Sequence, residues 1–189
     1  EDIALGLFFF LLAIPLMIPI SILILFSSGS PVIFKQKRLG WDGEVFVIYK
    51  FRTMIFMKNG DADTRQAEQN DKRFTKFGKL LRKTSLDELP QIINVLQGRM
   101  SLVGPRPHAL DHEETFKKQV KGYVRRYKVK PGITGWAQVN DLRGQINNIE
   151  DIRRRVQHDL FYIENWSVWF DLRIILTTVI KVFFSKQAW

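Results

Sequence analysis

Two adjacent carboxylates, Asp87 and Glu88, stand in the segment "TSLDELPQIINVLQG" at residues 84–98. The proline and the apolar run after them predict a helix beginning beside the pair, and a helix N-terminus attracts anions and keeps a carboxylate ionised. An ionised Asp can attack phosphorus to form an aspartyl-phosphate type intermediate, while its neighbour binds a metal or acts as a base. This interpretation makes the segment an active site for phosphate chemistry.

A structural interpretation of the same residues is a helix cap. Ser85-x-x-Glu88 fits a capping box, in which Ser85 accepts from an early helix amide and Glu88 reaches back to the Ser85 amide. Pro90 in the first turn costs nothing, because that amide has no partner inside the helix. Taken alone, the segment fits a helix cap better than an active site.

Phosphate chemistry requires positive charge close to the nucleophile. The candidate phosphate-binding residues are Lys50 and Arg52 in "YKFRT", Arg82, and Arg106 in "GPRP". Across 189 residues the formal net charge is +10, which predicts an anionic partner such as nucleic acid, an acidic membrane surface or a phosphorylated substrate. The chain has no cysteine, which excludes a disulfide framework and thiolate chemistry.

The first segment of the chain is typical of a membrane helix. Residues 3–26 carry a single polar side chain, Ser21, and roughly 20 apolar residues cross a bilayer core as a helix. Pro15 and Pro19 lack amide hydrogens, so a kink or break is expected in the middle. The segment either crosses the bilayer or dips in and returns to the same face. Basic residues after it favour a cytoplasmic position for the rest.

The remaining chain predicts short elements of mixed type, and therefore an α+β, mostly helical fold. Residues 31–53 fit a β-hairpin around "GWDG", and residues 57–76 fit a polar loop with some helix. Two short helices are expected to meet at Thr84–Ser85. The first of them has the pattern of a basic amphipathic helix on a membrane surface, and packing on a soluble core is nearly as good an interpretation.

Downstream, "SLVGPRP" predicts a rigid loop and "KPGITGWAQVN" a turn-rich segment. Helices are expected over "HEETFKKQVKGYVRRYKV" and "IEDIRRRVQHDLFYIENW". The last apolar stretch, residues 167–184, is interrupted by charges and fits an interfacial helix better than a transmembrane one.

Two further clusters have weaker functional interpretations. His108 and His112 have the i, i+4 spacing of zinc ligands, but no third ligand accompanies them. Arg153, Arg154 and Arg155 could contact nucleic acid phosphates, and a solvated or membrane-facing helix surface explains them better.

Four motifs stand in fixed order along the chain: "QKRLG", "YKFRTM", "LRKTSLDELPQIINVLQGRMSLVGPRP" and "KPGITGWAQVN". Together they resemble the bacterial sugar transferase family, the monotopic phosphoglycosyl transferases that begin glycan assembly on a lipid carrier. The resemblance implies transfer of a sugar 1-phosphate from a UDP-sugar to undecaprenyl phosphate, with release of UMP and with Mg²⁺ as cofactor. "GPRPHA" and the C-terminal segment are most similar to members that load glucose 1-phosphate for exopolysaccharide or capsule, and such members carry further segments upstream. Galactose and N-acetylhexosamine donors stay open.

The resemblance also implies roles for single residues. Asp87 matches the nucleophile that forms a covalent phosphosugar intermediate, and Glu88 matches its partner in metal binding or in activation of the lipid phosphate. Arg82 and Arg106 match basic residues near the phosphates. The first segment of the family is a re-entrant helix broken at a Ser-Pro pair, which here reads Ile14-Pro15 and lacks the hydroxyl.

The expected organisation is therefore monotopic, at the cytoplasmic face of the bacterial inner membrane. Residues 1–28 form the membrane-embedded helix, with its break at Pro15, and residues 29–189 form an interfacial catalytic domain. Expected partners are a UDP-sugar, undecaprenyl phosphate and membrane lipids, not nucleic acid, and homo-oligomer formation stays open. The competing hypothesis is a membrane-anchored basic binding module, which would release no UMP from UDP-glucose.

Overall fold

A computed structural model describes residues 2–55, 71, 73–144, 146 and 148–184. Most of the loop predicted at residues 57–76 lies outside the described residues. The helices and strands are α1 (Asp2–Ser28), β1 (Ile33–Leu39), η1 (Trp41–Gly43), β2 (Val45–Phe51), α2 (Lys76–Thr84), η2 (Leu86–Glu88), α3 (Gln91–Leu96), β3 (Ser101–Val103), α4 (Leu110–Gln119), η3 (Tyr123–Lys128), β4 (Gly132–Thr134), α5 (Trp136–Val139), α6 (Ile149–Glu164) and α7 (Val168–Phe184), where η marks a 3₁₀ helix. Helices dominate and strands are few, as expected.

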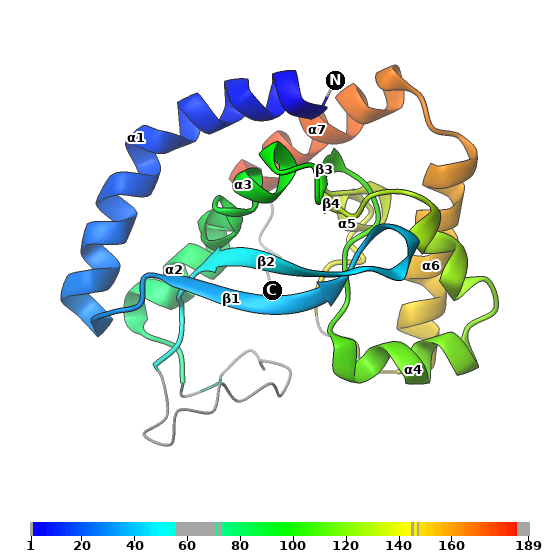
Figure 1. Ribbon diagram of the computed structural model, residues 1–189, viewed down its shortest axis with the longest axis horizontal. Helices are drawn as coiled ribbons and strands as arrows, with labels where there is room; N and C mark the ends of the chain where they lie inside the picture. The colour runs from blue at the N-terminus through cyan, green and yellow to red at the C-terminus, as the bar shows by residue number, and fades with distance from the viewer. Residues whose placement is uncertain (1, 56–70, 72, 145, 147, 185–189) are drawn as a thin grey trace.

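The apolar first segment forms one helix, α1, which bends instead of breaking. Figure 1 shows α1 curving along the side of the molecule, with Pro15 and Pro19 inside it. These prolines deprive the carbonyls of residues 11 and 15 of their helical amide partners. Ser21 donates to the carbonyl of Met17 at 2.7 Å, so its hydroxyl does not replace either lost bond.

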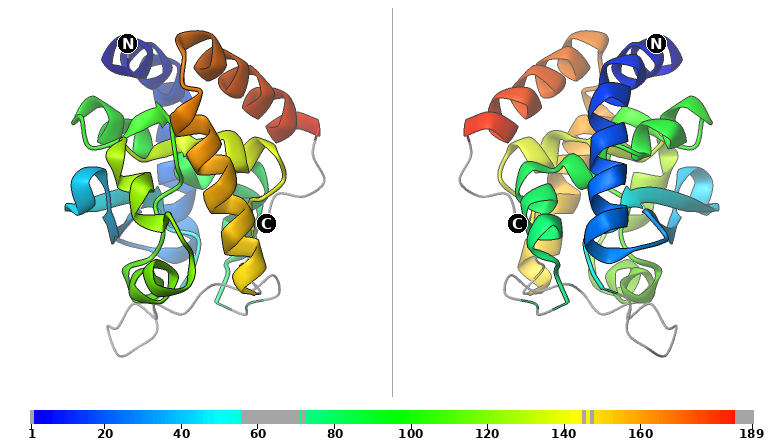
Figure 2. Two further views of the ribbon diagram at one scale, coloured as in Figure 1. Left: turned by 90° about the vertical axis from the view of Figure 1, so that its right-hand side faces the viewer. Right: turned by 90° about the vertical axis from the view of Figure 1, so that its left-hand side faces the viewer.

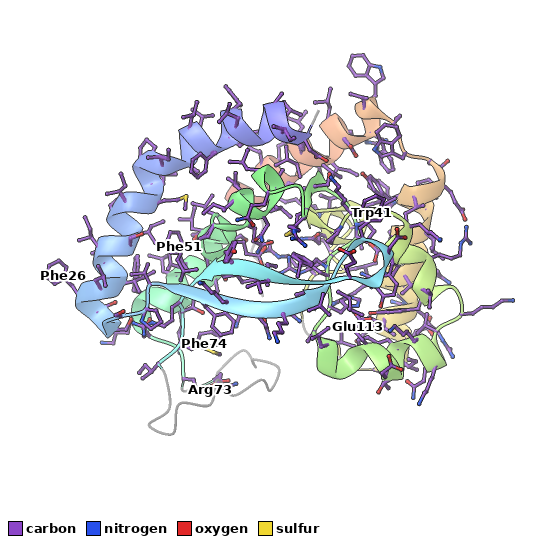
Figure 3. The ribbon with its side chains drawn as sticks, in the orientation of Figure 1. Phe26, Trp41, Phe51, Arg73, Phe74 and Glu113 are labelled. Atoms are coloured by element: carbon purple, nitrogen blue, oxygen red, sulfur yellow. The ribbon has the colours of Figure 1, made fainter. Side chains whose placement is uncertain are left out.

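The two faces of α1 differ in burial. A narrow stripe of four residues faces the rest of the molecule: Gly6, Ala13, Ile20 and Ile24. The opposite face exposes large apolar side chains, such as Phe26, which projects outward in Figure 3. α1 is long and apolar enough to cross a membrane. The exposed apolar face is typical of a helix that contacts lipid.

The predicted β-hairpin is confirmed. β1 and β2 pair antiparallel from Ile33 opposite Phe51 to Leu39 opposite Val45. The turn between them has positive φ at Asp42 and Gly43, which suits Asp and Gly better than other residues. A second, parallel pairing joins β3 to β4. Both of these three-residue strands were expected to be loop and turn, because they are too short to show periodicity.

Two of the predicted helices differ from the structure at particular residues. The single helix expected over residues 112–129 is divided into α4 and η3, because Gly122 adopts φ 82° between them. α2 shows features of both interpretations, the membrane-surface helix and the helix packed on a core. Leu81 is buried, while Leu80 and the neighbouring lysines are exposed. At α2, Gly78 contacts the chain after β2 so closely that a Cβ would lie 2.0 Å from the Thr53 carbonyl oxygen.

Three apolar clusters hold these elements around α3. One joins the hairpin, α3, β3, α6 and α7, and its members include Ile48, Val95, Met100 and Ile174. A second lies between α4, η3 and α6, and a third between α1, β2 and α2. Figure 2 shows that α7 and the N-terminal half of α1 lie at the same end of the molecule. α3 and the η2 turn before it are thereby held between the hairpin and the helices.

Candidate active site

The carboxylate pair lies in the η2 turn, between α2 and α3, and both side chains are buried. Ser85, just before them, adopts left-handed φ 59° and ends α2. Its hydroxyl makes no cap hydrogen bond and is buried without a partner among the described residues. The capping-box interpretation is therefore wrong, because the Ser85 hydroxyl bonds no helix amide and the Glu88 carboxylate accepts from cationic side chains instead.

Glu88 is surrounded by cationic groups from three separate segments. Lys50 of β2 lies 2.8 Å from its Oε1, and Arg106, from the loop after β3, donates to both carboxylate oxygens, at 3.0 Å to Oε2. Arg143, from the loop after α5, lies 3.8 Å from Oε2. Burial opposes the charged form of Glu88, but Arg106 and Lys50 outweigh it and hold the pKa of Glu88 well below its usual range.

Asp87 has the opposite environment. Among the described residues, none donates a hydrogen bond or forms an ion pair with its carboxylate, although only 6% of the residue is exposed. Burial and the neighbouring Glu88 charge raise the pKa of Asp87 to about 6, against the smaller opposing effects of Lys50 and Arg82. At neutral pH this carboxylate is mostly ionised, close to three cationic side chains and without a partner of its own. A nucleophile that attacks a phosphate has this combination of properties.

Comparison with known proteins agrees with this geometry. The sequence profile described as bacterial sugar transferase matches residues 1–185. The chain belongs to the bacterial sugar transferase family. It is 52% identical over its whole length to a UDP-glucose:undecaprenyl-phosphate glucose-1-phosphate transferase of Escherichia coli (strain K12), of which it covers 40%.

Two more relatives mark the range of this sugar transferase family. The chain is 42% identical over 87% of its length to a UDP-N-acetylgalactosamine-undecaprenyl-phosphate N-acetylgalactosaminephosphotransferase of Aeromonas hydrophila, covering 38% of that protein. It is 39% identical over 88% of its length to the exopolysaccharide production protein PSS of Rhizobium leguminosarum bv. phaseoli, covering 85% of it. The chain thus spans about two fifths of the E. coli and Aeromonas relatives and most of the Rhizobium one.

Among the cations predicted for this sugar transferase, three surround the carboxylates and one does not. Lys50 and Arg106 contact Glu88, and Arg82 acts on Asp87 through its charge while its guanidinium lies 4.8 Å from the Phe74 ring centroid. Arg52, the fourth, contacts the carbonyls of residues 28–30 instead of the carboxylate pair.

Arg52 is buried at the C-terminal end of α1. Its guanidinium donates to the carbonyls of Ser28, Gly29 and Ser30, including a 2.6 Å bond to the first. Carbonyls at a helix C-terminus lack amide partners and carry partial negative charge, so an arginine stabilises them. Arg52 therefore ties α1 to the strand that carries Lys50.

Arg143 is the cationic residue that the sequence analysis missed. It lies in "NDLRGQ", a segment with no apolar period and no glycine-rich phosphate motif, so its approach to Glu88 depends on the tertiary fold. Contacts on both sides hold the loop: Lys181 of α7 bonds Asp141 at 2.7 Å, and Arg155 of α6 donates to the Gly144 carbonyl. Arg153 and Arg154 are exposed, as a solvated helix surface predicts, whereas Arg155 is half-buried in this contact.

The residues at the carboxylate pair are suited to a Mg²⁺ ion that substrate phosphates also bind, and less to one held by protein ligands alone. The described residues contain no group of three or more side chains suited to hold a metal. Mg²⁺ typically binds one or two carboxylates together with substrate phosphates and water, and the oxygens of Asp87 are available for that. Both oxygens of Glu88 already accept hydrogen bonds from cationic groups. Asp87 is thus the better candidate ligand of the two.

Proposed function

We propose that the protein transfers a sugar 1-phosphate from a UDP-sugar to undecaprenyl phosphate and releases UMP, with Asp87 as the nucleophile. The unpartnered, ionisable carboxylate of Asp87 beside the cluster of cations is the observation that carries the proposal. The names of the relatives support the substrate classes.

Two displacements at phosphorus account for the transfer. An Asp87 carboxylate oxygen attacks the phosphorus that bears the sugar, and the bond from this phosphorus to the UMP oxygen breaks, so that UMP leaves. A phosphate oxygen of the lipid then attacks the same phosphorus and displaces Asp87. The product is a lipid diphosphate sugar, and the carboxylate is restored.

The cationic residues bind and orient the phosphates in this scheme. Lys50, Arg106 and Arg143 converge on one point from three segments, and they bring more positive charge than Glu88 neutralises. The surplus stabilises the charge that develops on phosphate oxygens during each attack. Asp87 would hold a Mg²⁺ ion, which would supply further neutralisation of phosphate charge when bound.

We also propose that α1 enters and leaves the membrane on the same face, the cytoplasmic one of the bacterial inner membrane. Asp2, at the start of α1, accepts from the Ser101 hydroxyl at 2.7 Å and from the Leu102 amide at 3.1 Å. At the other end Arg52 bonds the Ser28 carbonyl. Because the same polar domain holds both ends, a straight crossing would pull part of that domain through the bilayer. A re-entrant helix meets both constraints, and it places the chemistry where a soluble donor meets a lipid acceptor.

For the sugar we propose glucose, in the first step of exopolysaccharide or capsule assembly. Its support is the naming of several relatives as glucose-1-phosphate transferases and of another as an exopolysaccharide production protein. The Aeromonas relative, named for N-acetylgalactosamine, makes other UDP-sugars necessary comparisons.

The test is the intact mass of the protein after mixing with Mg²⁺ and UDP-glucose in the absence of lipid. We expect an added hexose phosphate that is absent in Asp87→Asn. UMP that appears only when lipid phosphate is present, with no adduct, would instead favour direct transfer in a ternary complex. A protein that gives neither adduct nor UMP with any UDP-sugar would favour the basic binding module.

A further inference from the structure

A buried polar network lies behind the loop that carries Arg106. Arg126 of η3 is 4% exposed, and its Nε donates to Asp159 of α6 at 2.7 Å. One terminal nitrogen donates to the backbone carbonyl of Arg106 at 2.5 Å, and the other lies 3.1 Å from Nδ1 of His108. The Tyr123 hydroxyl lies 2.7 Å from the same Nδ1.

The protonation of His108 follows from its neighbours. A guanidinium has no acceptor, so Arg126 donates to Nδ1 of His108, and that nitrogen carries no proton. Burial and the charge of Arg126 also hold the pKa of His108 well below its usual range. His108 is therefore a neutral acceptor within this network, which explains it better than a zinc site. The side chain of His112, the second histidine of the predicted pair, lies outside the described part of the structure.

Arg126 thus holds the Arg106 loop at two points, which are the Arg106 carbonyl and the His108 ring. Pro105 and Pro107, on either side of Arg106, have no amide hydrogens and cannot hold the loop through backbone donors. The Gly132 amide donates to the Pro105 carbonyl at 3.0 Å, and the donor to the next carbonyl, that of Arg106 itself, is Arg126. The side chain of Arg106 extends to the opposite side and bonds Glu88.

We propose that Arg126, neutralised by Asp159, is a positioning residue that places Arg106 at the phosphate-binding cluster. The proposal rests on the proposed function, because it assigns Arg126 an effect on the phosphates through Arg106. Arg126 itself bonds neither Asp87 nor Glu88. Its guanidinium is planar and reaches three acceptors at fixed angles, whereas a lysine ammonium would reach fewer of them at once.

The chain supplies a matched control next to Arg126. Arg125 is exposed and pairs with Glu164 on the surface at 2.7 Å. Arg126→Lys and Arg125→Lys are the same chemical change at adjacent positions, one buried behind the loop and one in solvent. Both variants are also made in combination with Arg106→Ala, so that the coupling between positions 106 and 126 is measured directly.

The first measurement is UMP release from UDP-glucose, with kcat and KM determined separately for each variant. We expect Arg126→Lys to lower kcat/KM about tenfold and Arg125→Lys to change it less than about twofold. In the Arg106→Ala background, Arg126→Lys is expected to add less than about twofold, because the residue it positions is gone. Equal losses in the two backgrounds would overturn the proposal, since a general loss of stability acts in both.

Hydrogen exchange gives a second readout that needs no activity. Backbone amides of residues 104–109 are expected to exchange faster in Arg126→Lys than in Arg125→Lys, and unchanged exchange there would also overturn the proposal. If Arg126→Lys does not fold, Asp159→Asn replaces it, because Asn keeps an acceptor for Nε and removes the charge. A wild-type protein that releases no UMP would refute the proposed function, and the exchange experiment would still decide whether Arg126 holds the loop.

Discussion

Asp87 and Glu88 are neighbours in the chain, yet the structure gives their carboxylates opposite surroundings. Glu88 accepts from Lys50 and Arg106, while Asp87 has no hydrogen-bond partner among the described residues. The buried Glu88 charge is compensated, whereas that of Asp87 is largely not. Glu88 is therefore suited to hold the cations together, and Asp87 to react.

Replacing the two carboxylates is expected to change stability in opposite directions. Asp87→Asn removes a disfavoured buried charge and should raise the free energy of unfolding at pH 7 by about 1–3 kcal/mol, while lowering UMP release by at least about 10³-fold. Glu88→Gln leaves Lys50, Arg106 and Arg143 without their shared counter-charge and should cost about 3 kcal/mol or more. Denaturant unfolding of both variants measures the difference, and losses in both would contradict the contrast.

Stability differences at Asp87 are expected to depend on pH. The pKa of Asp87 rises from 3.8 to about 6 on folding. Folding therefore favours the protonated acid, so its contribution is fully present below pH 4 and is lost as the pH rises through 6. The advantage of Asp87→Asn over wild type should appear at pH 7.5 and vanish near pH 4. Asp42→Asn, at an exposed carboxylate in the hairpin turn, is the control.

Activity should also depend on the ionisation of Asp87. It should rise with pH over the range in which the stability contribution of Asp87 falls. Only ionised Asp87 attacks phosphorus, so kcat/KM of the free enzyme should decline below a pKa of about 6. An unperturbed Asp would place this limb near pH 4. A profile that stays flat from pH 7 down to pH 5 would show that Asp87 is not the group that must ionise.

Arg52→Ala should release the C-terminal end of α1 without weakening donor binding. The variant loses several charged hydrogen bonds to the carbonyls of residues 28–30, for which we expect a cost of about 2 kcal/mol or more. UMP binding should stay within about twofold of wild type, whereas Lys50→Ala should weaken it clearly. Lys35→Ala, at an exposed position on β1, controls for loss of surface charge. Weakened UMP binding in Arg52→Ala would instead support the sequence-based assignment of Arg52 to the phosphates.

Asn94 of α3 should prove essential for the position of Lys50. Its side chain accepts from the Tyr49 amide at 3.1 Å and donates to the Val47 carbonyl at 2.7 Å, next to Lys50 on β2. Asn94→Leu leaves both backbone groups unpaired in a buried site, with an expected cost of about 2–4 kcal/mol. Thermal unfolding measures it, and Asn140→Leu, at an exposed position, should change little.

The topology of α1 is tested with single cysteines, since the chain has none. Glu1→Cys and Ser30→Cys flank the helix. In intact cells an impermeant thiol reagent should label neither, and after permeabilisation it should label both. Labelling of one position in intact cells would favour a helix that crosses the bilayer.

The residues that sequence analysis placed well are those in strong local patterns. The hairpin follows from alternating β-branched residues around a turn, and the end of α2 at Thr84 follows from the helical period before it. The second helix was expected to begin at Ser85, whereas α3 begins at Gln91, after the η2 turn. Lys50 and Arg106 were candidates from residue type, and Arg106 also from the family resemblance, but their spacing in the sequence did not show that they converge on the carboxylate pair.

The errors arose where tertiary contacts override local pattern. Ser85 and Glu88 fit a capping box by spacing, but the cations attract Glu88 more strongly than the amides do. Arg52 stands two residues from Lys50, yet its guanidinium bonds carbonyls at the end of α1 and does not contact the carboxylate pair. The approach of Arg143 depends on a loop held by α6 and α7, which no local signal reveals.

The double attachment of α1, at Asp2 and at Arg52, also bears on the kinds of membrane in which the protein works. A helix that crosses a bilayer must match its hydrophobic thickness, and a mismatch tilts the helix or deforms the lipid. A segment that turns back within one leaflet has no such length to match. If α1 is re-entrant, turnover in vesicles of increasing acyl-chain length should respond to the lipid packing of the leaflet that α1 enters. It should not respond to the thickness of the whole bilayer.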